Sequence, residues 1–133
     1  METHFKVAGA IMILLALIHL FFPRYFKWKE NLSSLSLINR QMMLVHTFFI
    51  AIVVFLIGLL SLFLSEDMVG TKFGGIISLG FALFWIARLF VQFFVYSSEL
   101  WKGKKFETTI HIVFALLWTY LSGVFITNFL NWA

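Results

Sequence analysis

Four long apolar stretches alternate with short polar segments along the chain. They cover residues 5–22, 41–64, 73–96 and 108–130, and each is close to the ~20 residues that a helix needs to cross a hydrocarbon core of ~30 Å. Backbone N–H and C=O groups cannot stay unpaired in lipid, so each stretch is predicted to be a helix. The pattern therefore predicts an all-α integral membrane protein in which residues 1–133 form one domain, a four-transmembrane-helix up-down bundle.

The polar segments suggest where these helices begin and end. Lys6 is followed by an apolar run without an A-x-A cleavage site, so we expect a first membrane helix and not a cleaved signal peptide. Pro23 is expected to end that helix, because proline cannot continue the helical hydrogen bonding. Ser33 or Ser34 is expected to cap a helix leading into the second span.

Composition supports a membrane protein and excludes several other classes. The 133 residues are 62% hydrophobic and 12% charged, which is too apolar for a soluble domain of this length. The chain has no cysteine, so disulfides, thiolate metal sites, iron–sulfur clusters and thiol catalysis are excluded. The basic residues are spread over short loops, so no nucleic-acid partner is expected.

The distribution of lysine and arginine predicts the orientation. Most of them lie in the first and third loops, namely Arg24, Lys27, Lys29, Arg40, Lys102, Lys104 and Lys105. The opposite side carries only Lys6 and Lys72. The first and third loops are therefore predicted to be cytoplasmic and both termini outside. Trp101, near a span end, is expected to belong to the interfacial aromatic belt.

Small residues along the spans predict close helix contacts. Each span contains some of them, among which are Gly9, Gly58, Gly74, Gly75, Gly80 and Gly123. Small side chains allow the backbones of two membrane helices to approach each other, so these positions are expected at helix interfaces.

Three histidines from three different spans are predicted to lie in one layer of the membrane. At a rise of ~1.5 Å per residue, His19, His46 and His111 would lie about 6, 9 and 6 Å inside the cytoplasmic ends of their spans. The third span adds Arg88 and Gln92, which are four residues apart and share a face. A single one of these residues is most simply explained by helix packing or snorkelling. Their coincidence at one level favours a functional polar site.

The first hypothesis for this site is a bis-histidine haem b protein, either an electron carrier or a cytochrome b-like subunit. The second and fourth spans are diagonal in an up-down bundle, so His46 and His111 would face each other as ligands. His19 would support the cofactor or replace one ligand. Arg40, Arg88 and Gln92 would hold the anionic propionates. This layout resembles membrane cytochrome b subunits in architecture.

Two further hypotheses use the same residues. In a non-haem enzyme acting on a lipidic substrate, His19, His46 and His111 would hold one Zn, Cu or Fe ion. In a non-catalytic protein, Arg88, Gln92 and a histidine would bind a lipid or quinone. The chain would then be an accessory subunit of a larger membrane complex, or a homo-oligomer. A transporter is disfavoured, because the outer half of the spans has no ionisable residues that match those of the cytoplasmic half.

Overall fold

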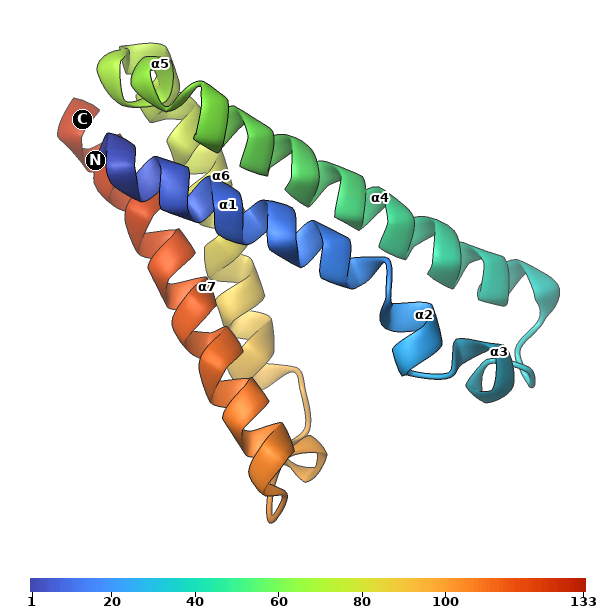
Figure 1. The fold of residues 1–133 in the computed structure, drawn as a ribbon. Helices are drawn as coiled ribbons and strands as arrows, with labels where there is room; N and C mark the ends of the chain where they lie inside the picture. The colour runs from blue at the N-terminus through green and yellow to red at the C-terminus, as the bar shows by residue number, and fades with distance from the viewer. The chain divides into compact units, whose positions relative to one another are not determined.

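The computed structural model describes all residues from 1 to 133 and contains helices without strands (Figure 1). In chain order the elements are α1 (Glu2–His19), α2 (Phe22–Tyr25), α3 (Trp28–Asn31), α4 (Leu37–Phe63), α5 (Ser65–Gly70), α6 (Lys72–Phe94), the 3-10 turn η1 (Ser98–Leu100) and α7 (Lys105–Trp132). The helices α1, α4, α6 and α7 are each long and apolar enough to cross a membrane. The all-helical fold with four potential spans is thereby confirmed.

The chain forms two compact units, each built around a hairpin of two long helices. In the unit Glu2–Ser65, α1 packs against α4, and α2 and α3 form the connection between them (Figure 1). In the unit Glu66–Ala133, α6 packs against α7. The single four-helix bundle over residues 1–133 stays a prediction.

The first long helix ends earlier than expected. α1 stops at His19, where the amides of Leu20 and Phe21 turn back to carbonyls of the last helical turn. Pro23 therefore does not end this helix. It lies in the first turn of α2, where a missing N–H group and a fixed φ angle are tolerated.

The start of α4 also differs from expectation. The residue before the helix is Ser36, and its side chain makes no capping hydrogen bond. Ser33 instead donates its hydroxyl to the carbonyl of Glu30 at 2.7 Å, within the preceding turn. The prediction that Ser33 or Ser34 caps this helix is therefore wrong, because local turn bonding competes for a serine hydroxyl.

Two glycines bring the backbones of α1 and α4 into contact. A Cβ atom on Gly9 would lie 2.7 Å from the carbonyl oxygen of Gly58 and 2.7 Å from the amide nitrogen of Leu62. A Cβ atom on Gly58 would lie 3.0 Å from the carbonyl oxygen of Gly9. Both glycines are therefore required by the close approach, which confirms the expectation at this crossing.

In the second unit, glycines play a mixed role. A Cβ atom on Gly74 would overlap the backbone of Met68, and one on Gly75 would lie 2.8 Å from the Trp132 side chain. By contrast, Gly80 and Gly123 would meet nothing within 4 Å. Gly80 and Gly123 therefore make no close contact within this unit, and the expectation of a helix interface stays a prediction at these two positions.

A buried asparagine joins the helices at the end of this hairpin that lies opposite η1. Asn128 of α7 is fully buried, and its Nδ2 donates to the carbonyl of Met68 at 2.9 Å and to Ser78 Oγ at 2.8 Å. These bonds join α7 to both α5 and α6. They help to fix the register of α6 against α7. This register also determines which polar side chains of the two helices meet at the η1 end of the hairpin.

Candidate functional site

A polar cluster lies between α6 and α7, towards the η1 end of the hairpin. Arg88 and Gln92 are one turn apart on α6, whereas His111 and Trp118 are two turns apart on α7, so each pair shares a face. Gln92 Oε1 accepts from Arg88 Nη1 at 3.3 Å and from Trp118 Nε1 at 3.3 Å. Gln92 Nε2 lies 2.7 Å from His111 Nδ1. The structure thus brings together three of the predicted site residues, Arg88, Gln92 and His111, around one buried amide.

These contacts determine where the proton of the neutral His111 ring lies. Guanidinium and indole groups can only donate, so the Gln92 atom facing Arg88 and Trp118 must be the carbonyl oxygen. The amide NH₂ group then faces His111 and donates to Nδ1. The proton of a neutral imidazole is consequently on Nε2, which leaves an N–H donor on that side of the ring.

Aromatic rings surround the Arg88 guanidinium. Its carbon lies 5.0 Å from the centre of the Trp118 ring and 5.4 Å from that of Tyr96. Both distances are in the range of cation–π contacts, which strengthen when the cation is removed from water. Tyr96 lies two residues beyond the end of α6, so the start of the third loop also contributes to the cluster.

A stack of rings supports the α7 side of the cluster. The Trp118 ring stacks with Trp85, at a centroid distance of 5.2 Å and an interplanar angle of 12°, and with Phe114, at 5.5 Å and 10°. Trp101 stacks on the His111 ring with a centroid distance of 3.8 Å and an interplanar angle of 16°. Trp101 was expected only as a belt residue, and this contact gives it a second role. The stacks restrict the rotation of both Trp118 and His111, so the cluster is held in one geometry.

The charge of Arg88 is not balanced by an acid. The residue is half-buried, one of its N–H groups bonds to Gln92, and no carboxylate lies within ion-pair distance. A guanidinium has five N–H donors and no acceptor. The groups that remain available, those of Arg88 and the His111 Nε2–H, are therefore all donors, so the site suits an anionic or acceptor-rich ligand.

The other predicted site residues belong to the unit of residues 2–65. His19 Nδ1 lies 2.7 Å from the carbonyl of Leu15, and His46 is exposed on α4. Arg40, in the first turn of α4, has a buried Nε without a hydrogen-bond partner. No hydrogen bond or ring contact joins these three residues to one another.

The ends of the helices differ from the ends of the predicted spans. His19 is the last residue of α1, His46 follows the start of α4 by nine residues, and His111 follows the start of α7 by six. At ~1.5 Å per residue the last two lie about 14 and 9 Å into their helices. Helix ends do not mark the edges of the hydrocarbon, so the common depth of the three histidines stays a prediction. The ends of α1, α4 and α7 differ by three or four residues from the ends of the predicted spans.

The three-histidine metal centre and the haem site require different arrangements of these residues. No three or more His, Asp or Glu side chains come together as a group that could hold a metal ion. The three-histidine centre with His19, His46 and His111 would draw ligands from both units and stays a prediction. A haem iron would need the lone pair of His111 Nε2, with Nδ1–H donating to an acceptor. In the structure Nδ1 accepts from Gln92, so a haem ligand at this position requires the Gln92 amide to reverse and to give up Arg88 and Trp118.

The bis-histidine haem hypothesis has a direct spectroscopic test. It predicts that protein purified gently in detergent shows a Soret band that shifts and sharpens after dithionite reduction. His46→Ala and His111→Ala should each abolish haem retention, whereas His4→Ala should retain it. A flat visible spectrum of the wild-type protein would contradict this hypothesis.

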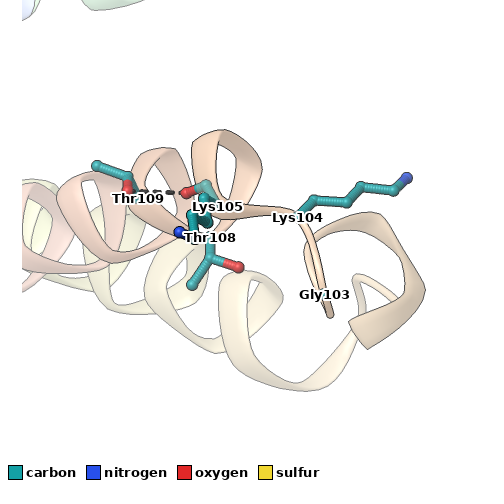
Figure 2. A pocket seen from close by; sticks show the side chains of 5 residues that line it. All are labelled: Gly103, Lys104, Lys105, Thr108 and Thr109. Carbon is teal, nitrogen blue, oxygen red and sulfur yellow. Dashed lines mark hydrogen bonds between the residues drawn. The ribbon is translucent and has the colours of Figure 1, made fainter.

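A separate open pocket of about 530 Å³ lies at the start of α7, lined by Gly103, Lys104, Lys105, Thr108 and Thr109 (Figure 2). The hydroxyl protons of this pocket are already donated within the chain. Thr108 donates to the carbonyl of Trp101 at 2.6 Å, and Thr109 donates to that of Lys105 at 2.8 Å. The Lys104 side chain extends away from the helix (Figure 2). The pocket is therefore a weaker candidate than the Arg88–His111 cluster.

Comparison with known proteins adds no family to this picture. No family model, no curated protein and no solved structure matches the chain.

Proposed function

We propose that the chain is a multi-pass membrane protein that binds the polar headgroup of a membrane lipid or quinone through Arg88, Gln92 and His111. The observation that carries this proposal is the half-buried Arg88 guanidinium, which has free donors and no carboxylate partner and shares the Gln92 amide with His111. Unpaired donors and an unbalanced charge are costly in a membrane, so a ligand rich in acceptors would stabilise this arrangement.

In this proposal α1, α4, α6 and α7 cross the bilayer as one up-down bundle. The excess of lysine and arginine in the first and third loops supports a cytoplasmic position of these loops, with both termini outside. The third loop joins α6 to α7, next to Arg88 and His111. The binding site would then lie in the cytoplasmic half of the membrane.

The chemistry of the cluster suits binding better than bond breaking. A guanidinium, an amide and an indole bind and orient a ligand, and the His111 imidazole adds one further hydrogen-bond donor. The proposed role is therefore that of a non-catalytic subunit, which works with other membrane proteins or with further copies of itself.

Retention of a native ligand tests this function. We expect native mass spectrometry of protein extracted in mild detergent to show a bound lipid or quinone. Arg88→Leu should lower its occupancy about tenfold or more, because a hydrogen bond to a charged group contributes about 1.5–3 kcal/mol. The control is Arg24→Leu, which removes an exposed arginine from α2 and should leave the occupancy unchanged. Equal occupancy in both variants would contradict the proposal.

A further inference from the structure

We propose that the ligand of this site is an anionic phospholipid of the cytoplasmic leaflet, held by its phosphate group. This inference rests on the proposed function and narrows its ligand to one chemical class. The argument uses the charge of the hairpin end, the directions of its donors and the apolar surface beside them.

The charge at this end of the hairpin is positive and not neutralised locally. Between residues 88 and 107 the chain carries four basic and two acidic residues. Both acids, Glu99 and Glu107, are exposed, and neither pairs with Arg88. A quinone carbonyl could accept a hydrogen bond here but would leave the charge of Arg88 unbalanced. A phosphate supplies both the acceptors and the negative charge.

The two donor residues are held by one side chain, the amide of Gln92. Arg88 and His111 both contact the single amide of Gln92, at 3.3 Å and 2.7 Å, so they lie on the two sides of one small group. Arg88 keeps further N–H donors, and His111 keeps its Nε2–H. A phosphodiester has two non-bridging oxygens that share one negative charge, and they can accept from the guanidinium and the imidazole at the same time.

The surroundings favour a lipid over a free phosphate ion. Arg88 lies six residues before the end of α6 and His111 six residues after the start of α7, inside helices apolar enough to span a membrane. Three phenylalanines of α6 are exposed, namely Phe90, Phe93 and Phe94. They offer an apolar surface that the acyl chains of a lipid could contact. The exposed lysines of the third loop follow, and such residues attract the anionic surface of the cytoplasmic leaflet.

The test is a binding titration of delipidated protein in detergent, read by native mass spectrometry. The ligands are short-chain phosphatidylglycerol, phosphatidylcholine with the same acyl chains, a short-chain ubiquinone and inorganic phosphate. We expect phosphatidylglycerol to bind at least tenfold more tightly than each of the other three. Arg88→Gln should remove this preference. Arg88→Lys, which retains the charge, should keep it within a few-fold.

The other outcomes separate this inference from the proposed function. Arg88-dependent binding of ubiquinone, without a preference for phosphatidylglycerol, would overturn the phospholipid and leave the proposed function intact. Tight binding of inorganic phosphate would overturn the lipid as the source of the anion. Loss of the preference in Arg88→Lys as complete as in Arg88→Gln would overturn the charge argument. If no ligand binds in an Arg88-dependent way, both proposals fail.

Discussion

Replacing Gly9 by valine is expected to destabilise the α1–α4 hairpin by about 3 kcal/mol, the upper part of the usual range for overpacking. The new Cβ would lie 2.7 Å from the carbonyl oxygen of Gly58 and from the amide nitrogen of Leu62. These are backbone atoms of α4, so no change of side-chain rotamer can relieve the overlap. The two helices must separate, and the contacts along their whole interface weaken with them.

The matched control is Gly123→Val in α7. A Cβ atom at Gly123 meets nothing within 4 Å, and the substitution makes the same change of helix propensity in the interior of a long helix. Unfolding of both variants by added denaturing detergent, followed by circular dichroism, should show a large loss of stability for Gly9→Val alone. Equal stability of the two variants would show that α1 and α4 do not approach each other at Gly9.

The four long helices are predictable from the sequence because lipid imposes both a length and an apolar composition on them. Their ends are less predictable. Asn39 and Arg40 look like a loop before the second span, yet α4 already begins at Leu37. Polarity marks where the hydrocarbon ends, whereas a helix continues as long as its backbone hydrogen bonds do. The common depth of the histidines in the membrane therefore stays a prediction, because the ends of the helices do not locate the hydrocarbon.

Part of the site was also accessible from the sequence. The spacing of Arg88 and Gln92 places them on one face of α6, and a histidine on the next span was a reasonable partner. The indole donor of Trp118 was missed as part of the polar cluster, although its spacing of seven from His111 puts both on one face of α7. The stacking of Trp101 on His111 could not be predicted, because it depends on how the third loop folds back over α7.

The glycines illustrate the same limit. Gly9 and Gly123 both lie inside apolar helices and look alike in the sequence, but only Gly9 contacts another backbone. Which face of a helix meets its neighbour depends on the register of the pair, and side-chain bonds such as those of Asn128 contribute to that register. Composition therefore identifies candidate contact residues without selecting among them.

Replacing Gln92 by glutamate is expected to neutralise Arg88 from within and to lower the affinity for phosphatidylglycerol at least tenfold, which is about 1.4 kcal/mol. The carboxylate can still accept from Arg88 and Trp118, so the shape of the cluster is kept. It cannot donate to His111, however, and Nδ1 must then carry a proton to preserve the hydrogen bond. The variant thus changes the charge of the site and the protonation of His111 while leaving the packing of the hairpin almost unchanged.

Two measurements check this prediction, with Gln41→Glu on the exposed start of α4 as a control for the added charge. In ¹⁵N NMR of histidine-labelled protein, His111 Nδ1 should be unprotonated in the wild type and in Gln41→Glu, and protonated in Gln92→Glu. The affinity for phosphatidylglycerol should fall in Gln92→Glu alone. A protonated Nδ1 in the wild type would contradict the assigned amide orientation. Unchanged affinity in Gln92→Glu would show that the headgroup does not depend on the charge of Arg88. A carboxylate beside the guanidinium must weaken the binding of any anion that depends on this charge.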